Sequence, residues 1–324
     1  MELHPETNSL LRQVAASADF PHLILYGPTG SGKKTRALAV LRELFGAGAE
    51  KVTVATRELQ GTSSKFTVPV VSSSYHLEIA PGDLGNKDAT VVQTLIKEAA
   101  QTPPPVSSGR PFKVVLISDA DCLSRQAQAA LRRTMEKYIS ACRIILVTDS
   151  LSKIIPPIRS RCLCVRVPAP SDLEIAKVLQ NACTFDNIRG QFPLEEISRS
   201  CDRDLRRALL MLDAARLSAR PGVIRPPWEE FAEEISRDVL TEQTPKKLLE
   251  VRGKLYDLLS SCIPGEVILR KLANSLADQS PEAKAAEFFS LAAKFEHSMR
   301  LGTKEIFHLE AFCARAMAAV RLGA

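Results

Sequence analysis

A glycine-rich stretch near the start of the chain has the residue types and spacing of a site that binds phosphate groups. It reads GPTGSGKKT over residues 27–35 and directly follows the apolar run HLILY at 22–26, which predicts a strand. Backbone amides can close around phosphate oxygens where no β-carbon intrudes, and the three glycines supply that freedom. The candidate phosphate-binding residues are Gly27, Pro28, Thr29, Gly30, Ser31, Gly32, Lys33, Lys34 and Thr35.

A helix is expected to begin where this stretch ends. Residues 34–45 have helical spacing, so the partial positive charge of the helix amino terminus would face the bound phosphates. A chance glycine turn is the alternative. The strand before the stretch and the helix after it argue against a chance turn and in favour of a phosphate loop.

One position of the loop departs from the usual pattern. The residue after the loop lysine is normally Ser or Thr, whose hydroxyl binds magnesium between the β- and γ-phosphates. Here Lys34 takes that place, and the hydroxyl comes one residue later at Thr35, turned by roughly 100° around the helix. The sequence therefore predicts that phosphate binds while magnesium is weakly held or absent, and it assigns no metal ligands.

A second strand end lacks the acid pair that nucleotide hydrolysis needs. The apolar run at 112–117 is typical of a central parallel strand, and SDAD follows it. An Asp for magnesium and a Glu to activate water are expected there. In one register Ser118 and Asp119 occupy these positions, and in the other Asp119 and Ala120 do. In either register one of the two acids is missing. The alternative, which we favour for Asp121, is that Asp119 and Asp121 only cap the next helix.

Length and composition indicate a globular protein of two or three domains. The 324 residues are 45% hydrophobic and 25% charged. No apolar run approaches the roughly 20 residues that span a bilayer, and the start lacks the features of a signal peptide, so we expect neither a membrane nor export. The eight cysteines show no zinc-type spacing, which predicts reduced thiols. The net charge of +6 permits contact with nucleic acid without requiring it.

Strands and helices are expected to alternate through the first half of the chain. With the phosphate loop first, this alternation is typical of an α/β fold with a doubly wound parallel sheet. A helical pattern from 171 to about 219 predicts a small lid, and the remainder is helical again. We expect domains at 1–168, 169–222 and 223–324. The further expected strands are 52–54, 65–71, 112–117, 143–148 and 163–167.

Two of the expected helices have a clear apolar face. In the helix at 124–138, Arg132, Arg133 and Glu136 point away from that face, where they would be solvated or meet a neighbouring subunit. Its apolar face consists of Ala127, Leu131, Met135 and Tyr138. In the C-terminal region, Thr244 with Pro245 is expected to cap a helix. Its apolar stripe consists of Leu248, Val251, Leu255, Leu258 and Cys262.

Three further stretches resemble a known family. ALRRTMEKY, SKIIPPIRSRC and DLRRAL are together specific to the AAA+ clamp-loader small subunits of replication factor C, and the resemblance covers the chain from about residue 8 to its end. SSSYHLE, GKKT, VRVPAP and QTPKKLLEVRGKLYDLL are similar to one eukaryotic subunit type. The resemblance implies an AAA+ P-loop sheet domain, a helical lid and an all-α collar domain.

The resemblance also implies roles for particular residues. Arg161, in the Ser-Arg-Cys motif, would be an arginine finger that enters the ATP site of the adjacent subunit, and Arg206 would be the lid arginine that reaches the γ-phosphate. The implied cofactor is ATP or ADP. The implied partners are four other subunits in a heteropentamer, the PCNA sliding clamp, and primer-template DNA contacted through its phosphates. Such a complex acts in replication and repair in the nucleus.

Departures from the family pattern limit what can be carried over. Lys34, Ser118 and Asp149 stand where active subunits have Ser or Thr, Asp and Asn, so whether this chain is itself an enzyme stays open. The Trp-x-x-Lys-Tyr-Arg-Pro segment of most members is missing, which leaves truncation open. Lys87 and Arg125 are candidates for DNA contact and residues 72–81 for clamp contact. An independent ATPase or kinase, and a scaffold with a vestigial site, are the rival functions.

Overall fold

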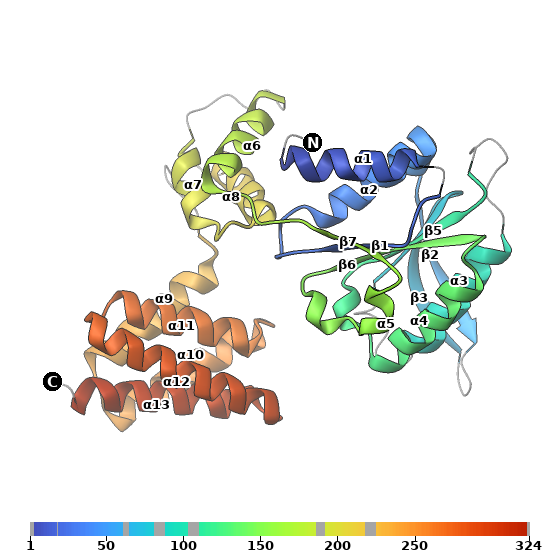
Figure 1. The fold of residues 1–324 in the computed structure, drawn as a ribbon. Coiled ribbons are helices and arrows are strands. Elements are labelled where there is room, and N and C mark those ends of the chain that lie inside the picture. Colours follow the sequence, from blue (N-terminus) through green and yellow to red (C-terminus); the bar gives the residue numbers. More distant parts are fainter. Residues whose placement is uncertain are drawn as a thin grey trace. The chain divides into compact units, whose positions relative to one another are not determined.

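The chain forms two compact units, residues 1–223 and 224–324. The computed structural model describes residues 3–17, 19–60, 65–80, 88–102, 110–185, 192–217 and 225–322. The first unit holds both the sheet and the lid, and the boundary expected between them at residue 168 stays a prediction. Figure 1 shows the order of the elements along the chain.

A seven-stranded mixed sheet forms the centre of the first unit within the described residues. Its strand order is β2-β3-β4-β5-β6-β1-β7, and the five strands from β4 to β7 pair in parallel. β2 and β3 form an antiparallel hairpin, and β3 also runs antiparallel to β4. The strands are β1 (Leu23–Tyr26), β2 (Thr53–Gln60), β3 (Lys65–Ser72), β4 (His76–Ile79), β5 (Lys113–Ile117), β6 (Cys142–Thr148) and β7 (Leu163–Arg166).

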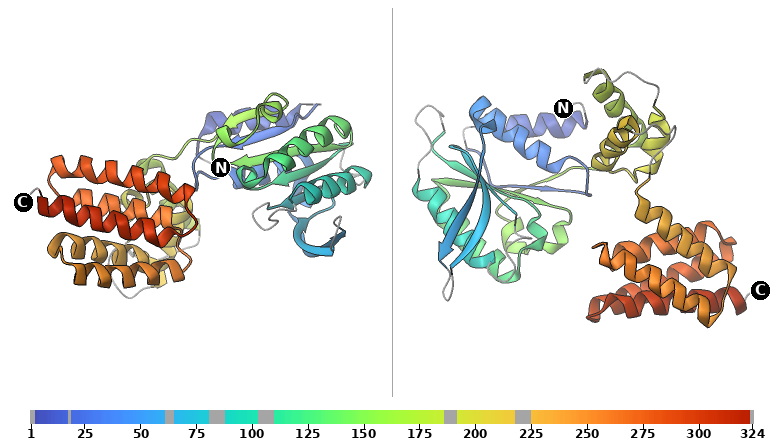
Figure 2. Two further views of the ribbon diagram at one scale, coloured as in Figure 1. Left: turned by 90° about the horizontal axis from the view of Figure 1, so that it is seen from below. Right: turned by 180° about the vertical axis from the view of Figure 1, so that it is seen from behind.

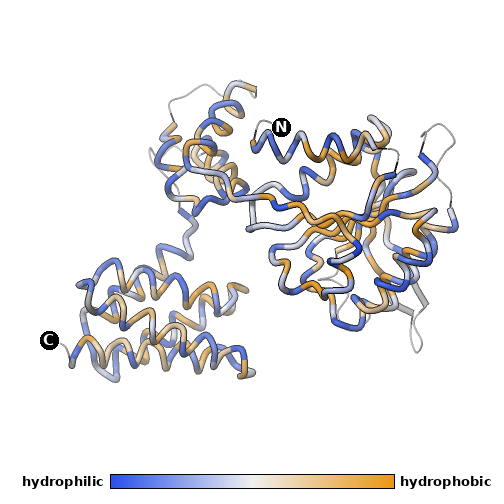
Figure 3. Tube along the Cα trace, in the orientation of Figure 1, coloured by the Kyte–Doolittle hydropathy of each residue, from blue (hydrophilic) through white to orange (hydrophobic). Residues whose placement is uncertain are grey.

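The prediction of a parallel sheet is therefore correct for five strands. It is wrong at one edge, where β2 and β3 are antiparallel. β4 was not expected, because four residues that include a charged Glu78 give little apolar pattern. The central position of β5 and β6 follows from their composition, since every residue of β6 is buried. Figure 3 shows this apolar run of strands inside the sheet domain.

Helices cover both faces of the sheet, so the domain has two hydrophobic cores. One core joins the sheet to α3 and α4 and includes Leu95, Leu131 and Ile144. The other joins it to α1 and α2 and includes Leu11, Leu41 and Leu116. Figure 1 shows these layers. The covering helices are α1 (Pro5–Ala16), α2 (Lys33–Phe45), α3 (Asp88–Gln101), α4 (Arg125–Lys137) and the short α5 (Pro156–Arg159).

The apolar face predicted for α4 is confirmed. Ala127, Leu131 and Met135 are buried, and Tyr138 packs against the same core. Ser124 caps the helix by accepting a hydrogen bond from Ala127 N at 3.1 Å. Asp121 does not cap it and instead pairs with Lys153 at 3.1 Å.

The lid contains three helices with a core of their own within the described residues. Ser171 and Glu174 form a capping box at the start of α6, with Ser171 N donating to Glu174 Oε2 at 2.8 Å. Ile175, Leu179 and Ile197 are among the buried residues that hold the helices together. The helices are α6 (Asp172–Phe185), α7 (Leu194–Ser200) and α8 (Leu205–Leu217).

The second unit is an all-helical bundle, as the sequence predicted (Figure 2). Thr244 caps α10 by accepting from Lys247 N at 3.2 Å. Val251, Leu255 and Leu258 are buried, but Cys262 lies past the helix end and is exposed. No described helix of either unit is long and apolar enough to cross a membrane. The bundle helices are α9 (Pro227–Thr241), α10 (Pro245–Ser260), α11 (Gly265–Asp278), α12 (Glu282–Leu301) and α13 (Glu305–Leu322).

His22, just before β1, makes the stability of the first unit depend on pH. Its Nδ1 accepts a hydrogen bond from Ile144 N at 3.0 Å, and burial, helped by Arg143, lowers its pKa to about 4. The unfolded chain takes up this proton near the ordinary pKa of about 6.5, so it binds more protons than the folded chain between these values. Stability should therefore fall as pH drops below about 6.5, by on the order of 2–3 kcal/mol near pH 4.

The measurement is urea unfolding followed by circular dichroism near pH 7 and near pH 5. His22→Asn retains a hydrogen-bond acceptor but does not titrate in this range. It should therefore reduce the difference in unfolding free energy between the two pH values. His297→Asn, at an exposed position of α12, should not. An unchanged pH dependence in His22→Asn would contradict the assignment.

Candidate nucleotide-binding site

The predicted phosphate loop lies between β1 and α2, at the carboxyl ends of the parallel strands. Gly27, Gly30 and Gly32 all have positive φ, between 71° and 153°. A β-carbon on Gly27 would lie 1.9 Å from the carbonyl oxygen of Val167, and one on Gly30 would lie 1.9 Å from Oδ1 of Asp204 in the lid. The backbone conformation and the close neighbours both require glycine at these positions.

The loop lysine is buried and fully engaged. Lys33 Nζ donates to the carbonyl oxygens of Gly27 at 2.9 Å and Pro28 at 2.8 Å, and to Asp149 Oδ1 at 2.7 Å. Asp149 Oδ2 accepts from Thr29 Oγ1 at 2.8 Å. Burial opposes ionisation of Asp149, but the bonds from Lys33 and Thr29 outweigh it and lower the pKa of the carboxyl group. The Asp149 carboxylate, at the position where active subunits have Asn, thus holds the loop lysine.

Lys34 forms a second ion pair beside the first. Its ammonium group contacts Glu78 Oε1 from the end of β4, and Ser118 Oγ donates to the same oxygen at 3.3 Å. The Glu78 side chain is only 12% exposed, whereas that of Lys34 is 49% exposed. An ammonium group and a serine therefore occupy the two positions where a magnesium site would have a hydroxyl and an acid.

These residues enclose a cavity of about 550 Å³ between the loop, the strand ends and the first turns of α8. It brings together most of the predicted site. Gly27, Pro28 and Ser31 do not line the cavity. Its lining includes Thr29, Gly30, Gly32, Lys33, Lys34, Thr35, Glu78, Ser118, Asp119, Asp149, Leu205, Arg206, Leu209 and Leu210.

The register after β5 follows from the backbone. Ser118 N donates to Ile79 O at 2.9 Å, so Ser118 continues the sheet. Asp119 comes next with a left-handed φ of 50°, and Ala120 is fully buried. Ser118 and Asp119 thus face the cavity, which fits the first of the two registers.

The donor set does not suit magnesium. This ion needs near-octahedral oxygen ligands at roughly 2.0–2.1 Å. Lys34 presents a positive charge at the place of the usual hydroxyl ligand, and Glu78 is already bound to it.

Arg161 does not line this cavity. It follows α5, and its Nε donates to Glu136 Oε1 of α4 at 2.6 Å. Its Nη1 donates to Pro157 O at 2.8 Å and Ser160 Oγ at 3.2 Å. The Arg161 side chain is 34% exposed, and Arg132 lies 3.7 Å from the same Glu136 oxygen. The guanidinium group of Arg161 is therefore held at the surface by its bonds to Glu136, Pro157 and Ser160.

Sequence reasoning missed a buried arginine that holds the loop. Arg36 of α2 is 1% exposed, and its Nη1 donates to the carbonyl oxygens of Ser31 at 2.9 Å and Gly32 at 3.3 Å. Its Nη2 donates to Leu3 O at 3.1 Å, and its Nε to Asn8 Oδ1 at 3.3 Å. Burial lowers the pKa of this guanidinium. The helical spacing gave no signal for it, since an arginine in an amphipathic helix is normally solvated.

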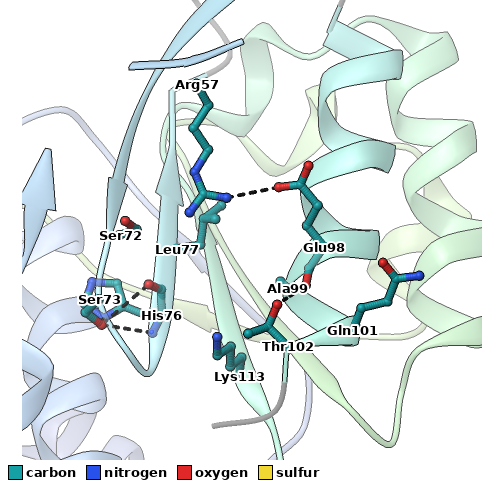
Figure 4. Close-up of a pocket in the computed structure, with 10 residues that line it drawn as sticks. All are labelled: Arg57, Ser72, Ser73, His76, Leu77, Glu98, Ala99, Gln101, Thr102 and Lys113. Carbon is teal, nitrogen blue, oxygen red and sulfur yellow. Dashed lines mark hydrogen bonds and ion pairs between the residues drawn. The ribbon is translucent and has the colours of Figure 1, made fainter. Parts of the chain in front are cut away.

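A second hollow, of about 340 Å³, lies at the opposite ends of the strands (Figure 4). Arg57 and Glu98 face each other across it and pair at 3.0 Å. The segment predicted to contact the clamp forms part of its wall, but His76, Leu77 and Ile79 of that segment are buried. Pro81 and Lys87 lie outside the described residues, and Arg125 is exposed at the start of α4. The clamp and DNA contacts stay predictions.

The strand order, the phosphate loop and the lid over it define an AAA+ type nucleotide-binding fold. A solved structure of a DNA polymerase III gamma subunit-related protein from Thermotoga maritima has a similar fold. It matches with a TM-score of 0.52 and 16% identity, over 97% of this chain and 100% of that one. Three family profiles also match. They are "DNA polymerase III, delta subunit" at 3–171, "RCF1/5-like, AAA+ ATPase lid domain" at 177–217 and "Replication factor C subunit 3, C-terminal domain" at 228–322.

Curated relatives narrow the class to one family. Replication factor C subunit 3 of Homo sapiens is 44% identical over 98% of this chain and 92% of its own length. Replication factor C subunit 5 of Neurospora crassa is 46% identical over 97% and 92%. The chain belongs to the replication factor C subunit 3 family, whose members are numbered 5 in some organisms. Clamp loading is supported at the level of this family, as is nucleotide binding.

The charge of Asp149 predicts an effect on nucleotide preference. Its carboxylate adds a negative charge to the cavity, so it should oppose a third phosphate more than a second. Asp149→Asn keeps an oxygen for Lys33 but removes the charge. It should raise the affinity for ATP roughly tenfold and that for ADP less.

Isothermal titration calorimetry of the purified chain with each nucleotide measures this. Asp213→Asn, on an exposed part of α8, is the matched control and should change neither affinity. Equal gains for ATP and ADP would count against repulsion of the third phosphate.

Proposed function

We propose that this chain is a clamp-loader subunit that binds ATP or ADP structurally and supplies Arg161 to the ATP site of a neighbouring subunit. The observation that carries the proposal is the contrast between its two candidate functional regions. The cavity is lined by Lys33, Lys34 and Arg206, with Ser118 and Asp119 where the acid pair is expected. Arg161 stands outside it with its guanidinium fixed by Glu136.

The composition of the cavity supports weak or absent hydrolysis by this chain. A general base contributes roughly 10²–10⁴-fold to such a reaction, and at the strand end Ser118 and Asp119 leave one acid where two are expected. The two carboxylates of Asp149 and Glu78 are engaged with lysines. Phosphate binding is supported by the loop amides, Lys33 and the exposed Arg206 of the lid.

The position of Arg161 supports a role in trans. An arginine finger needs a planar, permanently charged group that is held at a surface and can reach a phosphoryl group on another subunit. Glu136 fixes Nε of Arg161, and Arg132 adds a second guanidinium beside it. A multi-subunit complex is implied by the family. We propose four partner subunits, the PCNA clamp, primer-template DNA contacted through phosphates, and a place in the nucleus.

Arg161→Ala in the assembled complex is the main test. Removal of an arginine finger typically costs 10³–10⁵ in turnover at the site it serves. Arg161→Lys keeps the charge but loses the fork, so it should recover only part of the activity. The measurement is DNA- and clamp-stimulated ATP hydrolysis by the complex, together with its subunit content.

Arg166→Ala, at an exposed position on β7, is the matched control and should hydrolyse ATP like the unmodified complex. If the Arg161→Ala complex assembles fully and its ATP turnover is unchanged, the proposed role of Arg161 is wrong.

Lys33→Ala distinguishes the proposed structural binding of nucleotide from the rival hypothesis of a scaffold with a vestigial site. Loss of the buried ammonium removes a positive charge from the loop together with its bonds to two loop carbonyls and Asp149, so the purified complex should retain one nucleotide fewer. Quantifying bound nucleotide after denaturation measures this. Lys97→Ala, an exposed lysine of α3, should leave the content unchanged, and unchanged content in Lys33→Ala would favour the scaffold.

A further inference from the structure

Two lysines that line the cavity differ in burial and in their partners. Lys33 is buried in the loop, with its ammonium fixed by two carbonyl oxygens and Asp149. Lys34 stands at the next position, is half exposed, and its partner Glu78 comes from a different element. A lysine stem has several rotatable bonds, so Lys34 can leave Glu78 for a ligand with little backbone movement.

The surroundings of Lys34 are those of a cation site already filled by the chain. Glu78 is nearly buried and receives both the ammonium of Lys34 and the hydroxyl of Ser118. A buried carboxylate without its partner is costly, so this pair stabilises the site as it stands. A divalent ion entering here would meet the positive charge of Lys34 and would have to displace it.

An ammonium group can do part of what the metal ion does. It carries one positive charge and three hydrogen-bond donors, which suit the oxygens of two adjacent phosphates. Such charge-assisted hydrogen bonds are about twice as strong as neutral ones. A polyphosphate entering the cavity would compete with Glu78 for Lys34, and Glu78 would lower the observed affinity by its hold on the ammonium.

We infer that Lys34 replaces the divalent cation at this site, so that the chain binds nucleotide in its metal-free form, with Glu78 as the counter-ion that the phosphates displace. The inference rests on the proposed nucleotide binding and adds the ionic form of the ligand. Excess magnesium should not strengthen binding. It converts the free nucleotide into its magnesium complex, and the positive charge of Lys34 repels the bound ion.

The experiment is calorimetric titration of the purified chain with ADP, once with EDTA and once with excess magnesium. The unmodified chain should bind equally well or better with EDTA. Lys34→Thr restores the usual hydroxyl and removes the ammonium, so its affinity with EDTA should fall at least tenfold. With magnesium it should recover, and Lys34→Thr combined with Ser118→Asp should recover further.

Glu78→Gln gives an effect of the opposite sign. It frees Lys34 without removing it, so ADP should bind several-fold tighter with EDTA, a gain that misfolding cannot produce. Lys97→Thr, at an exposed position of α3, should behave like the unmodified chain under both conditions.

Tenfold tighter binding of ADP with magnesium by the unmodified chain would overturn the inference. So would equal affinities of Lys34→Thr and the unmodified chain with EDTA. Absence of any ADP binding under both conditions would overturn the proposed nucleotide binding itself, and the inference with it.

Discussion

The shape of the phosphate loop depends on the buried ammonium group of Lys33. Lys33 is nearly inaccessible to solvent, and a buried ammonium group is stable only when its donors are satisfied. Here two loop carbonyls and Asp149 satisfy them. This requirement fixes the curvature of the loop, for which the left-handed glycines are needed. It also ties the loop, which follows β1, to Asp149, which follows β6. The ends of these two strands are neighbours because β1 and β6 pair in parallel.

The same arrangement is the physical basis for proposing that the cavity binds nucleotide without cleaving it. Two of the carboxylates that line it, those of Asp149 and Glu78, pair with lysines. A carboxylate that holds an ammonium group is poorly suited to take a proton from water. The chain thus has cations where phosphate would lie, while a further cation, Arg161, is held outside by an acid of its own. The proposed function thus assigns nucleotide binding and catalytic assistance to different parts of one unit.

Much of this could be predicted from sequence because the signals are local. The strand, loop and helix at 22–45 follow from adjacent residues, and so do the faces of α4 and the cap of α10. β4 was missed because it owes its place to pairing with β5 rather than to its composition. The partners of Lys34 and Arg36 were missed for a related reason. Glu78 is 44 residues from Lys34, and no local pattern reports such a contact.

The contacts of Arg36 have a consequence for the first helix. One guanidinium group holds two loop carbonyls and also Leu3 and Asn8. Anything that shifts the start of α1 therefore acts on the floor of the phosphate cradle, although α1 contributes no motif residue. The amino-terminal turn thus supports the phosphate loop through Arg36 without lining the pocket itself.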